Sequence, residues 1–271
     1  MQGRVLIVAG SDSGGGAGIQ ADIKACAAMD AYSATAITAL TAQDTLGVHG
    51  VHPVPLEFVR KQIRLSLRDI GADAIKTGML GDAATIEAVC DALAEDGPGI
   101  PLVADPVMVA KGGSNLLAPD AVETLKRRLL PMAHLLTPNI PEAEVISGLR
   151  ITGLEEMRAA AKVMLGLGVP AVLLKGGHLE GDRLLDLLAT QEDEVVFESA
   201  RIPSRHTHGT GCTLASAIAA GLAQGMALRD AVARGRAFVQ AALRSAPGLG
   251  QGHGPLNHGV TVDPERIAAL A

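Results

Sequence analysis

Short apolar runs alternate along the chain with longer segments in which apolar residues recur every three or four positions. Residues 5–9 form a run of the first kind, whereas the apolar side chains of residues 56–69 share one helical face. Continuous apolar runs are typical of strands buried on both faces, and the longer periodicity is typical of the helices that cover them. The pattern therefore predicts strands and helices in alternation through most of the chain.

Most of the predicted strands are followed by a helix long enough to cross over a sheet. Strands are predicted at residues 5–9, 34–41, 73–77, 101–104, 134–136 and 171–174. Helices are predicted at residues 19–29, 56–69, 82–95, 118–130, 141–147, 154–167, 210–224 and 228–245. Strands joined through helices imply right-handed crossovers and a mainly parallel sheet with helices on both faces.

The segment between residues 183 and 202 departs from this alternation. Two short alternating runs, 184–188 and 194–197, flank a polar turn, which predicts an antiparallel hairpin at an edge of the sheet. No repeat of 20–50 residues and no tract resembling a linker interrupts the chain. We therefore expect one α/β domain over residues 1–271, with three α/β/α layers, a mainly parallel central sheet and an antiparallel edge hairpin.

Composition narrows the possible functions. With 48% apolar and 19% charged residues, the 271-residue chain can bury a sizeable core. A formal charge of −6, with three Phe, one Tyr and no Trp, argues against nucleic-acid binding, which needs positive charge or stacking rings. Cys26, Cys90 and Cys212 are scattered and the first apolar run is too short to span a membrane. We expect a cytoplasmic protein with no membrane partner.

The sharpest candidate for chemistry is the segment from His208 to Thr213, which opens an Ala-rich helix with the sequence HGTGCT. Its glycines permit close backbone approach, and the free N–H groups of a helix start attract an anion. A thiol in the first turn, that of Cys212, would have a lowered pKa and could act as a base or nucleophile. The alternative at this point is a capping turn followed by a cysteine packed in the core.

A second glycine-rich segment, residues 10–18, follows the first predicted strand. It is not a P-loop, because no Gly-Lys-Ser/Thr follows, and only Gly16-x-Gly18-x-x-Ala21 matches a dinucleotide fingerprint. No acidic residue ends the second predicted strand, as that fingerprint requires. The segment is open to two interpretations, a loop that contacts a small ligand or a tight strand-to-helix turn.

Charged and amide side chains follow three other predicted strands. Lys175 ends one strand and could neutralise phosphate charge, and Asp105 ends another. Asn139 and Glu142 stand three residues apart at a helix start, which suits either a capping interaction or oxygen ligands for the water shell of Mg²⁺. An anion-binding helix start, a strand-end lysine and acidic Mg²⁺ candidates together supply the parts that phosphoryl transfer needs.

Seven segments, taken in their order along the chain, resemble the motifs of one known enzyme family. They are residues 9–22 (AGSDSGGGAGIQAD), 38–45 (TALTAQDT), 76–80 (KTGML), 105–108 (DPVM), 137–139 (TPN), 175–178 (KGGH) and 207–213 (THGTGCT). As a set they resemble the hydroxymethylpyrimidine/phosphomethylpyrimidine kinase family of the ribokinase superfamily. The resemblance covers essentially the whole chain and implies a ribokinase-like fold, ATP and Mg²⁺ as cofactors, a small aminopyrimidine alcohol as substrate, and commonly a homodimer.

The resemblance also implies roles for single residues. It has Gln43 read the aminopyrimidine edge, in a pocket lined by Gly10, Ala17, Thr41, Met79 and, more weakly, Val107. It makes Gly209, Thr210 and Gly211 the hole for the transferred phosphoryl group, with Lys175 bridging phosphate charge. Cys212, where sugar kinases of the superfamily carry an Asp, would take the proton of the substrate hydroxyl. Asn139, Glu142 and, less certainly, Asp105 would hold Mg²⁺ through water.

Other functions are weighed against this one. A pyridoxal or pyridoxine kinase of the same superfamily is the main alternative, and Gln43 with Met79 favours the pyrimidine. Cys212 in place of Asp disfavours a sugar kinase. A non-catalytic ligand-binding protein with this fold conflicts with the intact Lys175, Glu142 and anion loop, and a dinucleotide oxidoreductase rests on the Gly16–Ala21 match alone.

Overall fold

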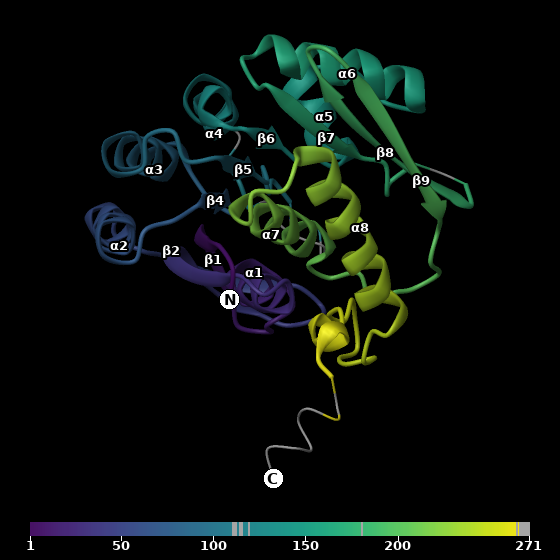
Figure 1. Cartoon of the computed structure of the whole chain (residues 1–271), viewed down its shortest axis with the longest axis horizontal. Coiled ribbons are helices and arrows are strands. Elements are labelled where there is room, and N and C mark those ends of the chain that lie inside the picture. The colour runs from purple at the N-terminus through teal and green to yellow at the C-terminus, as the bar shows by residue number, and fades with distance from the viewer. Residues whose placement is uncertain (110–112, 114–115, 119, 180, 264, 266–271) are drawn as a thin grey trace.

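The computed structural model describes residues 1–109, 113, 116–118, 120–179, 181–263 and 265 (Figure 1). Within them, the strands are β1 (Arg4–Asp12), β2 (Tyr32–Gln43), β3 (Val48–Pro53), β4 (Ala74–Thr77), β5 (Leu102–Ala104), β6 (Leu135–Leu136), β7 (Ala171–Lys175), β8 (Arg183–Thr190) and β9 (Glu194–Ala200). The α-helices are α1 (Gly18–Ala28), α2 (Leu56–Asp69), α3 (Ala83–Asp96), α4 (Ala121–Thr124), α5 (Ile140–Ser147), α6 (Leu154–Gly166), α7 (Thr210–Ala223) and α8 (Leu228–Arg244).

One sheet joins all of these strands, in the order β3-β2-β1-β4-β5-β6-β7-β8-β9. The strands from β2 to β7 pair in parallel, and β7, β8 and β9 pair antiparallel. The predicted parallel sheet and its edge hairpin are confirmed. Because parallel strands end at the same edge of a sheet, the segments that follow β1, β2, β4, β5 and β7 are brought together.

Helices cover both faces of the sheet, as the continuous apolar strands require. On one face Val59 of α2, Ile86 of α3 and Met157 of α6 pack in one core with alternate residues of the strands. On the other face Cys26 of α1 and Ile218 of α7 belong to a second core. Figure 1 shows α1, α7 and α8 on the second face, away from α2 and α3. The three layers follow from this division.

Two sequence predictions differ from the structure. β3 was not predicted; it pairs antiparallel with β2 at the sheet edge, and its exposed side chains give no apolar run. The helix expected at residues 118–130 is α4 followed by a π-helical turn, Leu125–Leu129, and a 3₁₀ turn, Leu130–Met132. Pro131 lacks an N–H group and does not continue a regular helix, and Pro119 lies outside the described residues.

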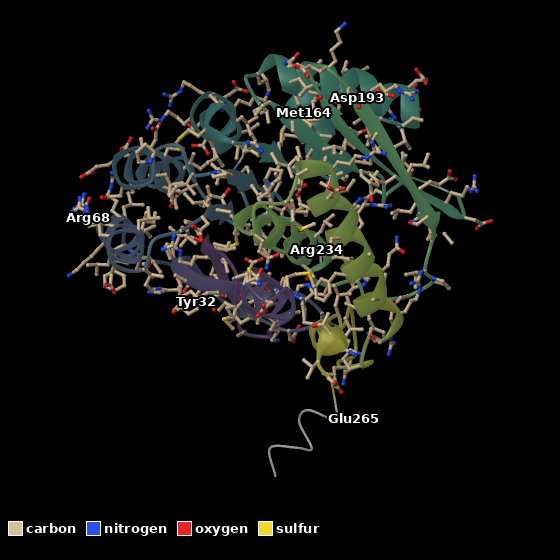
Figure 2. All side chains as sticks on the ribbon, viewed as in Figure 1. Tyr32, Arg68, Met164, Asp193, Arg234 and Glu265 are labelled. Atoms are coloured by element: carbon tan, nitrogen blue, oxygen red, sulfur yellow. The ribbon has the colours of Figure 1, made fainter. Side chains whose placement is uncertain are left out.

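Charged side chains gather on the outer surface. Arg68 on α2 and Asp193 in the turn between β8 and β9 both project from the periphery in Figure 2, where Met164 of α6 is also marked. Met164 is fully buried. None of the described helices is long and apolar enough to cross a membrane.

Candidate active site

A cavity of ≈ 710 Å³ opens where the carboxyl ends of the central strands meet α7. Its size is typical of sites for small molecules. All the residues that the sequence singled out line it: Gly10, Ala17, Thr41, Gln43, Met79, Asp105, Val107, Asn139, Glu142, Lys175, Gly209, Thr210, Gly211 and Cys212. The fold therefore brings together segments that are up to about 200 residues apart, and the predicted set occupies one place.

The start of α7 has the backbone of an anion site. Gly209 is its N-cap, with φ of 80°, and it offers no side chain to cap the first turn. A Cβ on Gly209 would lie 1.8 Å from the Gly16 carbonyl oxygen, so the glycine-rich loop after β1 packs directly against this helix start. The conformation and the contact both require glycine. First-turn N–H groups consequently face the cavity without a side-chain partner.

Cys212 lies half-buried in the first turn of α7, as predicted, but its acidity is not as predicted. Burial raises the pKa of its thiol to about 12, and the carboxylates of Asp22 and Asp105 act in the same direction. The Lys76 ammonium and the Gly18 N–H oppose this shift without overcoming it. The expectation of a lowered pKa was wrong because it considered the helix start and not the loss of hydration around the buried sulfur.

A buried ion pair lies close to Cys212. Lys76, on β4, donates from Nζ to both carboxylate oxygens of Asp22, at 2.9 Å each, and the Ser216 hydroxyl donates to the same carboxylate at 2.7 Å. Lys76 and Asp22 are fully buried. Burial alone would lower the pKa of Lys76, but its acidic neighbours raise it, so the ammonium stays charged. This pair places a fixed positive charge near the thiol.

Lys175 and Asp105 meet on the other side of the anion loop. Lys175 Nζ lies 3.1 Å from Asp105 Oδ1, and a Cβ on Gly211 would lie 3.1 Å from the same Nζ. Burial opposes the ammonium charge, yet Asp105 and Glu142 hold the pKa of Lys175 above its ordinary value. A cation therefore stands beside the helix start, where transferred phosphoryl charge would sit.

Asn139 and Glu142 form a capping box at the start of α5, which is one of the two roles that the sequence allowed for them. The Asn139 side chain accepts from the Glu142 N–H at 3.0 Å, and Glu142 Oε2 accepts from the Asn139 N–H at 2.8 Å. Burial raises the pKa of Glu142, with Asp105 adding to the shift and Lys175 opposing it. No group of three or more His, Cys, Asp or Glu among the described residues could by itself hold a metal ion.

The loop after β1 is organised by Asp12, whose side chain is almost fully buried. Its carboxylate accepts N–H bonds from Gly14 at 2.8 Å, Gly16 at 3.1 Å and Ala17 at 2.8 Å. His208 Nε2 lies 2.8 Å from Asp12 Oδ2. Burial alone would raise the pKa of Asp12, but the bond to His208 and the backbone donors lower it, so the group is a carboxylate.

Gln43, at the end of β2, is held on both its backbone and its side chain. The Ser13 hydroxyl donates to the Gln43 carbonyl and accepts from its N–H, both at 2.9 Å. The side-chain amide lies between Thr41 and His208. Met79 packs beneath Gly10, where a Cβ would lie 2.5 Å from its methyl group. These contacts leave the Gln43 amide at the wall of the cavity.

The C-terminal strap, residues 249–256, packs across both loops. The His253 N–H donates to the Thr45 carbonyl at 2.8 Å, and the His208 N–H donates to the Gly254 carbonyl at 3.2 Å. A Cβ on Gly252 would lie 2.1 Å from the Thr45 carbonyl oxygen. The strap thus joins the loop that carries Gln43 to the loop that starts α7.

Sequence reasoning missed Asp12, His208 and Lys76 as parts of the site. Lys76 follows two apolar residues, Ala74 and Ile75, near the end of a strand, which is a shorter form of the signal that identified Lys175. Asp12 stood within a loop already singled out, and His208 within the segment that opens α7. Their pairing, across 196 positions, has no local signal.

Comparison with known proteins shows which family the chain belongs to. The sequence profile of the family described as phosphomethylpyrimidine kinase matches residues 12–257. The chain is 45% identical to the hydroxymethylpyrimidine/phosphomethylpyrimidine kinase of Bacillus subtilis, over 94% of each chain. It is 52% identical to a thiamine biosynthesis bifunctional protein of Geobacter sulfurreducens, covering 95% of this chain and 52% of the relative. This chain therefore spans about half the length of that bifunctional relative.

Solved structures show the same relationship. A pyridoxal kinase of Bacillus subtilis in complex with ADP superposes with a TM-score of 0.89 at 36% identity, covering 96% of this chain and 98% of that one. A phosphomethylpyrimidine kinase of Clostridium difficile superposes with a TM-score of 0.78 at 40% identity, covering 88% and 97%. The ribokinase-like fold and a family match that extends over most of the chain lead to one conclusion: this chain belongs to the phosphomethylpyrimidine kinase family.

Proposed function

We propose that this chain is an ATP-dependent kinase of thiamine biosynthesis. It converts 4-amino-5-hydroxymethyl-2-methylpyrimidine to its monophosphate, and then the monophosphate to the diphosphate. The observation that carries the proposal is one cavity that joins the Gln43 amide to the anion loop of Gly209 and Gly211. An amide matches the donor and acceptor of an aminopyrimidine edge, and the helix start matches phosphate. The relatives named hydroxymethylpyrimidine/phosphomethylpyrimidine kinase support the same reaction.

The phosphoryl group would be held by backbone and by one side chain. The N–H groups at the start of α7 point at it, and Lys175, 3.1 Å from Asp105 in the structure, turns toward its oxygens. In such a transfer the protein mainly positions the reactants and neutralises charge. The ADP and AMP-PCP complexes of related pyridoxal kinases support ATP as the donor.

Mg²⁺ fits the acidic wall of the cavity. Asp105, Glu142 and the Asn139 amide are hard oxygen donors that line it, and they are too few to enclose a metal on their own. Mg²⁺ keeps several of its waters and takes few protein ligands, so these residues would hold it through water. When bound, the ion neutralises charge on the phosphates of the donor.

In this proposal Cys212 takes the proton of the substrate hydroxyl. Its thiol, with a pKa raised to about 12 by burial, is a strong base only in the small fraction that is ionised. In a loose transition state the proton can leave late, so a scarce thiolate is tolerated. The monophosphate enters the second transfer with its acceptor oxygen already ionised, and there Cys212 has no proton to take.

The experiment that tests the function is product identification by phosphorus NMR. The purified protein is incubated with Mg-ATP and with hydroxymethylpyrimidine, its monophosphate or pyridoxal in parallel. We expect the first two to give the mono- and diphosphate. Phosphorylation of pyridoxal alone would contradict the proposal while leaving the fold and the anion site as they are.

Pyridoxal kinase remains the second candidate, because one observation favours it. The chain superposes on pyridoxal kinases with TM-scores of 0.89, above the 0.78 of the Clostridium difficile phosphomethylpyrimidine kinase. Sequence identity gives the opposite order: it is 34–36% to the pyridoxal kinases and 40% to the Clostridium difficile phosphomethylpyrimidine kinase. The parallel incubation with pyridoxal separates the two.

We also propose that the enzyme is a cytoplasmic homodimer. β3 is the last strand at one edge of the sheet, and its Val51 is 51% exposed. Apolar side chains at an open strand edge favour pairing with a second copy. Light scattering on the purified chain should give twice the monomer mass of 27.7 kDa; a monomer at micromolar concentration would contradict this.

A further inference from the structure

The Gln43 side chain touches one neighbour at each end of its amide. Its Nε2 lies 3.3 Å from His208 Nε2, and its Oε1 lies 3.1 Å from Thr41 Oγ1. The two ends of a glutamine amide have nearly the same shape, so the hydrogen-bonding character of the neighbours decides which end belongs where. Each neighbour can be assigned from its own partners.

His208 offers no acceptor to Gln43. Asp12 is a carboxylate that already accepts three backbone N–H bonds, so its contact with His208 Nε2 at 2.8 Å requires the proton on that nitrogen. His208 Nε2 therefore has no lone pair for Gln43, and its one hydrogen points to Asp12. An amide NH₂ at 3.3 Å places donor against donor, whereas an amide oxygen there would share that hydrogen with Asp12.

Thr41 offers an acceptor to Gln43. A hydroxyl has one hydrogen, and Thr41 Oγ1 donates it to the Ser11 carbonyl at 2.9 Å, which is the shorter of its two contacts. Lone pairs of Thr41 Oγ1 then face Gln43, and they match an amide NH₂. Both neighbours, which come from different segments, therefore favour the same orientation of the Gln43 amide, with Oε1 toward His208 and Nε2 toward Thr41.

We propose that Gln43 binds substrate with its amide turned by half a revolution, so that Oε1 faces His208 and Nε2 faces Thr41, and that the Asp12–His208 pair holds it there. His208 and Asp12 are positioning residues in this scheme, since they act through Gln43. The proposal rests on the function proposed above for its choice of substrate. The orientation of the amide itself does not depend on that function.

The turned amide fixes which way round the pyrimidine lies. The exocyclic amino group donates to Oε1 on the His208 side, and the neighbouring ring nitrogen accepts from Nε2 on the Thr41 side. On the substrate the order along this edge is hydroxymethyl, amino, ring nitrogen. The hydroxymethyl group therefore lies beyond the His208 end, toward the segment that runs from His208 to Cys212 at the start of α7. The opposite amide orientation would point it toward Thr41, away from the anion loop.

The direct test is an NMR measurement on the full chain with ¹⁵N-labelled glutamine side chains. We expect nuclear Overhauser contacts from the Gln43 NH₂ hydrogens to the Thr41 methyl group, in the free enzyme and with the pyrimidine bound. Contacts from those hydrogens to the His208 ring instead would overturn the proposal. Because this readout needs no turnover, it decides the amide orientation even if the pyrimidine proves not to be the substrate.

A kinetic test asks whether His208 maintains specificity. A 4-oxo analogue presents an acceptor and a ring N–H, the reverse of the 4-amino edge, so it needs the opposite amide orientation. In His208→Asn the amide loses one anchor, and we expect the preference in kcat/KM for the 4-amino over the 4-oxo compound to fall about tenfold, with the KM for ATP unchanged. Equal losses on both compounds would show a merely structural role and overturn it.

His49→Asn is the matched control. His49, on β3, pairs through Nε2 at 3.0 Å with Asp44, the residue that follows Gln43, but it is exposed, and the Gln43 amide contacts Thr41 and His208 instead. We expect this variant to keep the preference between the two compounds. A loss of preference in His49→Asn as large as that in His208→Asn would assign the effect to the loop and contradict the role of His208.

Discussion

The two halves of the cavity are built in different ways. The half that we propose for phosphate consists of Asp105, Lys175, Gly209, Gly211 and Cys212, and the half that we propose for the pyrimidine consists of Asp12, Thr41, Gln43, Met79 and His208. The phosphate half is supplied by a helix start and by charges at strand ends, which any parallel α/β sheet places at one edge. In the pyrimidine half, orientation depends on a chain of hydrogen bonds between remote residues.

This difference separates catalysis from recognition. Backbone N–H groups and a lysine can hold any phosphoryl group. The phosphate half therefore suits both transfers, and it suits a pyridoxal kinase as well as a pyrimidine kinase. The donor and acceptor order at Gln43 suits one kind of ring edge. We expect changes in the first half to affect every substrate, and changes in the second to affect the choice among substrates.

The largest effect is expected at the buried Lys76–Asp22 ion pair close to Cys212. Lys76→Met leaves Asp22 as a buried charge without its partner, and breaking such a pair costs about 3–5 kcal/mol. Urea unfolding of the variant should show this loss in the free energy of unfolding. Lys126→Met removes a lysine whose partner Glu123 is mostly exposed, and it should cost less than about 1 kcal/mol. Similar losses in both variants would contradict this expectation.

Lys175→Met tests the expectation that a change in the phosphate half affects both transfers. Loss of one fixed charge at the transferred group typically lowers kcat by about 10²–10³-fold, and here it should do so for both transfers alike. Rates of mono- and diphosphate formation check this. Lys162→Met, on the exposed face of α6, serves as the control. A loss confined to one transfer would break the assignment of Lys175 to both.

Gly252→Ala tests whether the C-terminal strap, residues 249–256, supports the pyrimidine half. The new methyl group would lie 2.1 Å from the Thr45 carbonyl oxygen, and the displacement should cost about 1–3 kcal/mol in the free energy of unfolding. Because Thr45 follows Gln43 closely, the KM for the pyrimidine should rise while the KM for ATP stays the same. Gly47→Ala, in the same loop, meets no atom within 4 Å and should change neither. A rise in the KM for ATP alone would contradict this coupling.

The pH dependence separates the two transfers. Only the thiolate of Cys212 accepts a proton, and burial has raised the pKa of the thiol to about 12, so the ionised fraction grows with pH through the working range. The rate of the first transfer should rise about tenfold per pH unit between roughly pH 6 and 9, whereas the second should not follow it. A first transfer whose rate is flat with pH would exclude the thiolate as the acceptor.

Much of the fold and of the phosphate half could be predicted from local sequence. Continuous apolar runs gave β1 and β7, helical periodicity gave α2 to the residue, and Lys175 is recognisable because it ends a buried strand. β3 was not predicted because its side chains are mostly exposed and form no apolar run in the sequence. The substrate role expected of Gln43 came from the resemblance and not from any local pattern.

The remainder depends on contacts between distant segments. The pKa of Cys212 depends on Lys76, Asp22 and Asp105, which come from three other segments, and on burial that the helix start does not reveal. The pairing of Asp12 with His208 joins the first strand to the start of α7. Local sequence gives residue types and strand ends, whereas acidity and amide orientation arise from what the fold packs around them.

We propose that one site carries out both transfers and that Cys212 serves only the first. The rate of each transfer in Cys212→Ala decides this, followed by phosphorus NMR with hydroxymethylpyrimidine and with its monophosphate as separate substrates. We expect a much larger loss in the first rate than in the second. Equal losses in both rates would contradict the role of Cys212 as the proton acceptor.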